Sequence, residues 1–194
     1  MHKRRSIRLA DYDYSDAGAY FITICTHQHR CLLGAIDDDN VTLSNYGQIA
    51  KTVWGAIPQH FAYVRLDHCV VMPNHVHGIL FIEDHPEADI ARHVENESNQ
   101  GAEVGAQYIV PLRQTQRSFG SMDAGSLSNI VRTYKAAVTR QINQTCETPP
   151  PKLWQRNYYE HVVRGERDLN RIREYILANP ARWAEDEYYR SLNS

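Results

Sequence analysis

Two apolar runs on either side of a turn dipeptide constrain the fold more than any other feature of this sequence. Residues 63–82 read YVRLDHCVVMPNHVHGILFI, and Pro73-Asn74 in the middle is typical of a tight turn. Short runs rich in Val and Ile around such a turn indicate two antiparallel strands that pair with each other. We therefore expect a hairpin in the core of the protein, with its second strand at about 76–82.

The other periodic segments alternate between strand and helix patterns. Ser44 offers an N-cap to one predicted helix, and Ser126 or Ser128 offers one to the next. Pro180 ends the pattern of a third. The predicted elements are strands at 20–26 and 153–164, and helices at about 44–58, 126–143 and 165–180. This order favours an α+β fold, a ferredoxin-like sandwich with a mostly antiparallel central sheet and helices packed on it. The last helix lies either with the others or across the far face.

Length and composition predict one domain. A chain of 194 residues is long enough for one hydrophobic core, so we expect 1–194 to form a single domain. Residues 84–125 are rich in Glu, Gln, Ser, Asn and Gly without periodicity, which is typical of a flexible insertion, and the first part of this segment is acidic. The sequence has no long apolar run and no apolar leader, so we expect a cytoplasmic protein without a membrane partner.

Charge is unevenly distributed along the chain. The formal net charge is −2, but residues 109–173 contain more Lys and Arg than Asp and Glu. Either phosphate contacts or an ordinary solvated face would account for this basic excess. Charge alone therefore leaves a nucleic-acid partner open.

His75 and His77 are the first candidates for chemistry. Alternate residues of a strand share one face, so both imidazoles point the same way and Val76 points to the other side. Two imidazoles on one face can bind one metal ion. A pair of surface or hydrogen-bonded histidines is the alternative, and the spacing by itself does not decide between them.

Tyr175 and Asn179 are the second candidates. They are four residues apart, so a helix places both on one side. Taken alone, Tyr175 is explained by core packing and Asn179 by a helix C-cap before Pro180. Taken with the histidine pair, they make a metal site with a nucleophile beside it.

These motifs resemble those of a known protein family. MPNHVHGIL at 72–80 resembles the HUH motif of single-strand DNA endonucleases, and LWQRNYYEHVVRGERDLNRIREYILANPARW at 153–183 resembles the C-terminal region of REP-associated tyrosine transposases, which are relatives of the single-tyrosine insertion-sequence transposases. The resemblance implies that His75 and His77 bind a divalent metal ion, Mg²⁺ or Mn²⁺, with Asn179 as third ligand. It implies Tyr175 as the nucleophile, single-stranded or hairpin DNA as the substrate, and a monomer or homodimer.

The expected function is that of a metal-dependent single-stranded DNA endonuclease and strand transferase that works through a 5′-phosphotyrosine. Tyr134 is an alternative nucleophile, although Val138 stands where a ligand would follow it. A catalytically inactive hairpin-binding module and a phosphodiesterase that uses metal-bound water are the alternative functions. The expected DNA contacts are the basic residues around the motifs, namely Arg132, Lys135, Arg140, Lys152, Arg156, Arg164, Arg171 and Arg173.

Overall fold

A four-stranded antiparallel sheet forms the centre of the computed structural model, which describes residues 17–83, 126–186, 188 and 189. The strand order is β4-β5-β1-β6, and every pairing is antiparallel. The strands are β1 (Gly18–Cys25), β4 (Val64–Val71), β5 (His75–Ile82) and β6 (Tyr159–Val162). In chain order the core reads strand, helix, two strands, helix, strand, which confirms the predicted α+β, ferredoxin-like sandwich.

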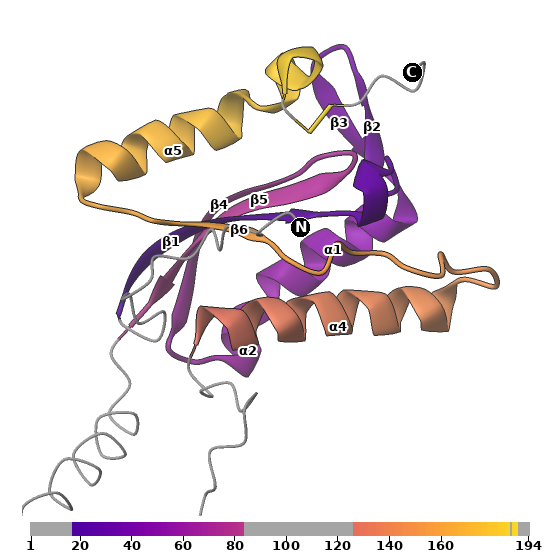
Figure 1. Cartoon of the computed structure of the whole chain (residues 1–194), viewed down its shortest axis with the longest axis horizontal. Coiled ribbons are helices and arrows are strands. Elements are labelled where there is room, and N and C mark those ends of the chain that lie inside the picture. The colour runs from indigo at the N-terminus through magenta and orange to yellow at the C-terminus, as the bar shows by residue number, and fades with distance from the viewer. Residues whose placement is uncertain (1–16, 84–125, 187, 190–194) are drawn as a thin grey trace, which may run out of the picture.

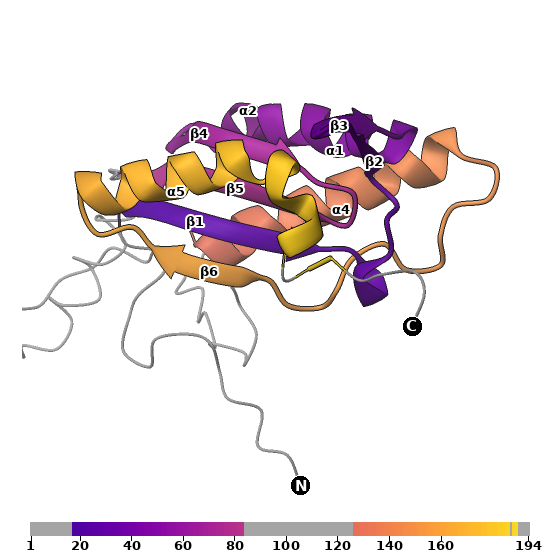
Figure 2. The ribbon, with the colours of Figure 1, turned by 90° about the horizontal axis from the view of Figure 1, so that it is seen from above.

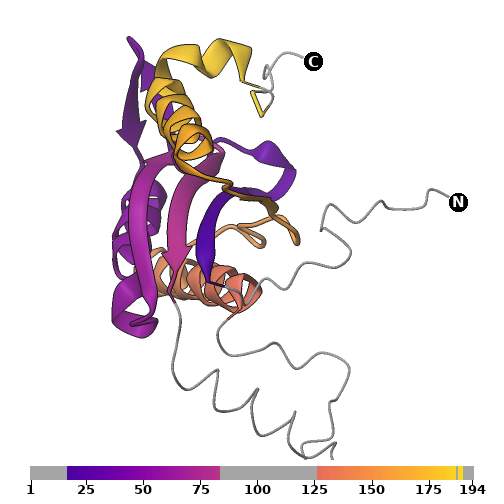
Figure 3. The ribbon, with the colours of Figure 1, turned by 90° about the vertical axis from the view of Figure 1, so that its left-hand side faces the viewer.

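Helices cover both faces of this sheet. The helices α1 (Asn45–Gly55), α2 (Ile57–His60) and α4 (Leu127–Thr145) lie on one face, and α5 (Glu166–Ala178) lies on the other (Figures 1 and 3). Ser44 caps α1 by accepting a hydrogen bond from the Gly47 N–H at 3.2 Å, and Ser126 caps α4 in the same way through Asn129. Both predicted caps are therefore confirmed, and α5 takes the far-face position that the sequence left open.

The main hydrophobic core lies between the sheet and α1 and α4. Val76 and Leu80 of β5 point into it and pack with Trp54 of α1 and Tyr134 of α4. The face under α5 carries a smaller cluster, formed by Phe21, Ile79, Ile172 and Ile176. Successive residues of one strand thus serve two different layers.

The predicted strand at 153–164 is wrong in its first half. Trp154 forms an isolated bridge with Thr26, and the strand itself begins only at Tyr159. The Lys135 ammonium donates to the carbonyls of Gln155 and Asn157, both at 3.0 Å, so these carbonyls are not available to a neighbouring strand. The chain between Trp154 and β6 is therefore held by Lys135 of α4 and by a single bond from the Gln155 N–H to the Cys25 carbonyl of β1 at 2.9 Å, and not by a continuous strand ladder.

A small hairpin was not predicted from the sequence. Strands β2 (Gly34–Asp37) and β3 (Asn40–Leu43) pair with each other as a separate two-stranded sheet. Asp38 and Asp39 form its turn with φ values of 45° and 62°, the left-handed conformation that two-residue hairpin loops require. Two 3₁₀ helices complete the fold, η1 (His27–His29) and η2 (Pro180–Glu185).

The expected acidic insertion at 84–125 lies outside the described residues. None of the helices within the described ranges combines the length and the apolar character that a membrane span needs.

Candidate active site

Strand β5 places the two histidines on the α5 side of the sheet, where His77 Nε2 contacts the Tyr175 hydroxyl. Figure 2 shows α5 lying over this face of the sheet. His75 is 0% and His77 1% exposed, and their ring centroids are 4.3 Å apart. Their neighbours explain why they face this way, because Val76 is buried in the main core and Gly78 lies against Trp54. A Cβ at Gly78 would lie 2.2 Å from the Trp54 ring, so any larger residue there would force this ring to move. The predicted shared face of the histidine pair is confirmed.

Hydrogen bonds fix how each imidazole presents its nitrogens. Asn74 donates its amide to the carbonyls of His29 and Tyr188, at 3.1 and 2.7 Å, which turns its Oδ1 toward His75. His75 Nδ1 therefore donates to that oxygen at 2.8 Å and leaves the Nε2 lone pair exposed to the site. His75 Nε2 is buried and has no hydrogen-bond partner within the described part of the chain. Such an oriented nitrogen is typical of a metal ligand.

His77 is oriented from the neighbouring strand. Its Nδ1 lies 2.9 Å from the hydroxyl of Thr23, the residue paired with it on β1. Its Nε2 lies toward α5 and contacts the Tyr175 hydroxyl at 3.3 Å. The turn before β5 therefore orients the His75 ring, and β1 orients the His77 ring.

Both histidines are neutral at physiological pH. Burial lowers the pKa of His77 from 6.5 to about 3. Burial also lowers the pKa of His75 well below 6.5, and the nearby His77 and His29 rings act in the same direction, while the Asn179 side chain opposes the shift. Neutral imidazole is the form that binds metal ions, so the site is prepared for one without losing a proton.

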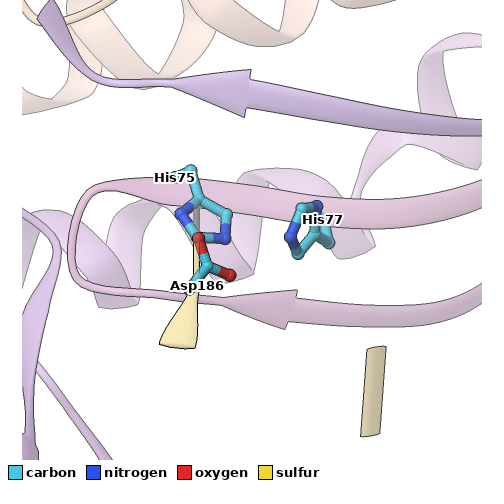
Figure 4. Close-up of side chains that lie close together, drawn as sticks. All are labelled: His75, His77 and Asp186. Atoms are coloured by element: carbon cyan, nitrogen blue, oxygen red, sulfur yellow. The ribbon is translucent and has the colours of Figure 1, made fainter. Parts of the chain in front are cut away.

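Oxygen atoms from the end of the chain complete this group. Asp186, which follows η2, places its carboxylate so that one ligand atom each from His75, His77 and Asp186 all lie within 4.8 Å of one another (Figure 4). Asn179 is 3% exposed and donates its amide to Asp186 Oδ2 at 3.0 Å. That bond leaves Asn179 Oδ1 buried without a hydrogen-bond partner among the residues that the structure describes.

These atoms fit a divalent cation. Two imidazole nitrogens, a carboxylate oxygen and a carboxamide oxygen are a mixed set that suits Mn²⁺ and other divalent ions, and two of the atoms are buried without partners. The sequence indicated Asn179 but missed Asp186. No periodic pattern or motif marked Asp186, because it follows the last predicted helix in a segment whose path is set by tertiary contacts.

Tyr175 lies beside this group on α5. Its side chain is 42% exposed, and its ring packs edge-on against Phe21 with centroids 6.1 Å apart. Asn179, four residues later, is the C-cap of α5 and keeps a helical conformation with φ −60° and ψ −41°. The helix therefore brings Tyr175 and Asn179 to the same two histidines, as their spacing predicted.

A cleft of about 850 Å³ opens over these side chains. Its walls carry charges of both signs, with Arg171 and Arg182 among acidic residues such as Glu174. The aromatic part of the wall consists of Phe21, Tyr159, Tyr175 and Tyr188. Such a cleft, lined along α5 from Arg171 to Ala178, has room for an extended ligand.

The eight basic residues expected to contact DNA do not gather in one place. Arg171 lines the cleft, and with Arg164 it also lines a second groove at the N-terminal end of α5. Residues 132, 135 and 140 belong to α4, on the opposite face of the sheet (Figure 3). Lys135 is bound to backbone carbonyls, and burial lowers its pKa to about 8. Arg173 forms an ion pair with Asp67 of β4. Lys152 and Arg156 lie between α4 and β6.

The structure does not bring Tyr134 to the histidines. It is 2% exposed in the main core, where its hydroxyl donates to the Ala50 carbonyl at 3.2 Å. Burial raises its pKa well above 10, so the phenolate is strongly disfavoured.

Comparisons with known proteins agree with this architecture. No protein-family model matches the chain. An uncharacterised protein of Haemophilus influenzae (strain ATCC 51907 / DSM 11121 / KW20 / Rd) is 39% identical over 189 residues, which are 97% of this chain and 94% of that protein. The solved structure of a REP-associated tyrosine transposase bound to a REP hairpin superposes with a TM-score of 0.55 over 92% of this chain and 77% of that one, at 15% identity. The chain thus belongs to the same family as the Haemophilus influenzae protein and has the fold of the REP-associated tyrosine transposase.

Proposed function

We propose that this protein is a metal-dependent single-stranded DNA endonuclease and strand transferase that acts at hairpin DNA through Tyr175. One observation carries the proposal: Tyr175 is 42% exposed, and its hydroxyl lies 3.3 Å from His77 Nε2, beside a group of side chains that could hold a metal ion. Tyr175 also lines the cleft, so a ligand bound there can reach this side chain.

His75 and His77 would hold the divalent ion, with Asp186 and Asn179 supplying oxygen ligands. We propose Mg²⁺ or Mn²⁺, because the remaining positions would be filled by phosphate oxygen and water, which suit these ions. When bound, the ion would supply a Lewis acid that polarises the scissile phosphate.

The nucleophile would be the Tyr175 oxygen. It forms a bond to phosphorus while the bond from phosphorus to the 3′-oxygen breaks, and the phenolic proton is transferred, directly or through water, to the departing 3′-oxygen. The products are a 5′-phosphotyrosine and a free 3′-hydroxyl. Because the phosphodiester energy is kept in the tyrosine link, a 3′-hydroxyl can attack it, release Tyr175 and join two strands.

Side chains around Tyr175 would prepare this step. Phe21 holds the phenol ring edge-on, which limits the directions from which its oxygen approaches a phosphate. Phenols have a pKa near 10, so at neutral pH a nearby cation is needed to stabilise the negative charge that develops on the oxygen as the proton leaves. Arg171 lies one helical turn before Tyr175 and lines the same cleft, and it is the side chain we propose for that role.

Hairpin DNA is the proposed substrate because a protein of the same fold was solved with a REP hairpin. The cleft along α5 offers stacking surfaces such as Tyr159, which is 40% exposed, for unpaired bases. We take 1–194 as one catalytic domain that acts as a monomer or a homodimer.

The test is to trap the covalent intermediate. The protein is incubated with end-labelled single-stranded hairpin DNA from its own genomic neighbourhood and Mn²⁺ or Mg²⁺, and the products are separated on a denaturing gel and mapped by peptide mass spectrometry. We expect an adduct on Tyr175 that requires the metal and is absent in His75→Ala. Cleavage without any adduct would favour the metal-water phosphodiesterase, and binding without cleavage under every metal would favour the inactive hairpin-binding module.

A further inference from the structure

Strand β4 contains a bulge directly beneath α5. Leu66 pairs with Leu80 and Cys69 pairs with Gly78, so two residues, Asp67 and His68, stand opposite the single residue Ile79. Leu66 and Cys69 both pack against the main core, on the side of α1 and α4. Asp67 is therefore on the α5 side, and the bulge allows β4 to present it there without moving its apolar residues to the wrong face.

The Asp67 carboxylate is buried and fully engaged. Its side chain is 7% exposed, and Oδ1 accepts a hydrogen bond from the His68 N–H at 2.8 Å and contacts the His68 ring. Oδ2 accepts from Arg173 Nε at 3.0 Å and from Arg173 Nη2. Burial opposes ionisation, but the hydrogen bonds from Arg173 and His68 outweigh it and lower the pKa of Asp67 to about 2. This ion pair joins the sheet to the helix that carries Tyr175.

The apolar contacts of α5 leave its rotation poorly determined. Only Ile172 and Ile176 of this helix are buried, and they form a single row against Phe21 and Ile79. Such a row attaches a helix to a sheet but resists rolling about the helix axis only weakly, because apolar contacts have no direction.

The ion pair constrains this rotation close to Tyr175, in addition to the bond that Asp168 accepts from His161 of β6 at 2.8 Å near the start of α5. Arg173 and Tyr175 are two residues apart, so they lie on nearly opposite sides of α5. Arg173 reaches β4 on one side of the helix, while Tyr175 reaches His77 on the other. A helix held at Arg173 cannot roll without moving the Tyr175 hydroxyl away from the histidines.

We infer that Asp67 and Arg173 are positioning residues, which fix the rotation of α5 and thereby hold the Tyr175 hydroxyl beside His77. This inference rests on the proposed function, since it assigns the pair a role in the reaction of Tyr175. It gives Arg173 a different task from the DNA contact that the sequence suggested.

The first test is a double-mutant cycle with Asp67→Asn, Arg173→Gln and the double variant. We measure the single-turnover cleavage rate of labelled hairpin DNA under Mn²⁺ and, separately, the affinity for the uncut DNA at several salt concentrations. Each single variant is expected to cleave about 10- to 100-fold more slowly, because a displacement of about 1 Å has effects of that size. The double variant is expected to be no slower than the slower single variant, since both remove one interaction. DNA affinity is expected to stay within about twofold, because neither change removes a contact to DNA.

A phosphate contact would give the opposite pattern. If Arg173 binds DNA, Arg173→Gln weakens affinity and lowers the salt dependence by about one phosphate contact, while Asp67→Asn leaves cleavage intact. That result would overturn the inference. Arg173→Lys is expected to restore part of the rate, since it keeps a cation within reach of Asp67. The matched control is Glu83→Gln, which removes the exposed ion pair between Glu83 and Arg65 of β4 and does not touch the Asp67–Arg173 pair.

A second measurement needs no cleavage. A 3-fluorotyrosine placed at position 175 reports the surroundings of that ring by ¹⁹F NMR. Asp67→Asn and Arg173→Gln are expected to move or broaden its resonance in the same way, whereas Glu83→Gln leaves it unchanged. An unmoved resonance in both variants would overturn the inference. If the wild-type protein does not cut DNA under any metal, the proposed function fails, and the resonance still decides whether this pair orients Tyr175.

Discussion

The two faces of the central sheet differ in what they bury: one covers the main hydrophobic core, and the other carries the candidate active site. The face toward α1 and α4 is filled by a large apolar cluster that includes Trp54 and Tyr134. The face toward α5 has a small apolar cluster. Beside it lie two buried polar atoms, His75 Nε2 and Asn179 Oδ1, which have no hydrogen-bond partner among the described residues. Both faces are built from the same strands, so adjacent residues belong to different tasks. We therefore expect that a side chain on one face can be changed with little effect on the other.

The difference also has an energetic side. Burying an unpartnered imidazole nitrogen and an unpartnered carboxamide oxygen costs on the order of 1–3 kcal/mol each. The α5 face accepts this cost, and the apolar packing on the opposite face offsets it. Sites that bind ligands commonly sacrifice stability in this way.

The largest expected effect comes from a matched pair of tyrosines, one on each face. Tyr175→Phe is expected to reduce cleavage of hairpin DNA by at least about a thousandfold, because it removes the proposed nucleophile. Its free energy of unfolding should change by less than about 0.5 kcal/mol, since the side chain is half-exposed. Tyr134→Phe removes the hydrogen bond to the Ala50 carbonyl, so its free energy of unfolding is expected to fall by about 1 kcal/mol. Its cleavage of hairpin DNA is expected to be normal. Cleavage assays and urea unfolding of both variants check this division, and equal cleavage by the two would refute it.

The second prediction concerns Gly78, the residue next to His77 in the sequence but on the opposite face. Gly78→Ala places a methyl group 2.2 Å from the Trp54 ring, and this overpacking is expected to cost about 2 kcal/mol of unfolding free energy. Chemical denaturation measures the loss. The added methyl group points away from the metal-binding atoms, so the shift of the melting temperature by Mn²⁺ should persist. If the shift vanished, the two faces would not be independent.

A third experiment tests which oxygen atoms on the α5 face bind the metal ion. Asp186→Asn and Asn179→Ala each remove one oxygen that lies near the histidines. We expect each change to weaken Mn²⁺ binding about tenfold, measured by titration calorimetry or by the Mn²⁺-induced thermal shift. Asn179→Ala also releases Asp186, so it should have the larger effect. An unchanged affinity in one variant would remove that residue from the ligand set.

The smallest expected effect is a pH dependence that arises on the α5 face. The pKa of Asp67 is about 2 in the folded protein and 3.8 as an ordinary value, so the carboxylate stabilises the fold fully above about pH 4. This contribution is lost as the pH falls toward 2. Unfolding free energies measured across that window should fall less steeply in Asp67→Asn than in the wild type. Identical slopes would show that Asp67 does not contribute.

Local patterns in the sequence predicted the parts of the molecule that follow a regular period. The shared face of His75 and His77 depends only on strand alternation, and the meeting of Tyr175 and Asn179 depends only on helix geometry. Both are properties of a few neighbouring residues, so they were accessible without knowing the rest of the fold.

The features that escaped prediction depend on contacts between distant segments. Asp186 reaches the histidines through the path of the chain after η2, which no period describes. The bulge at Asp67 and His68 adds one residue to an alternating strand, and the sequence does not mark which residue is the extra one. Lys135 and Arg173 were predicted to contact DNA, which stays a prediction, and each also has a partner on a distant segment that a one-dimensional pattern cannot show.

The position of α5 at the end of the fold has a consequence for the order in which the protein acquires activity. His77 and Tyr175 contact each other across 98 residues of chain. At a synthesis rate of about 5–20 residues per second, roughly 5–20 seconds separate their appearance on the ribosome. During that interval the nascent chain contains both histidines but no nucleophile. Asn179 and Asp186 also follow Tyr175 in the chain, so under the proposed function a protein still being made lacks the oxygen ligands of its metal site as well as its nucleophile, and it cannot cut DNA.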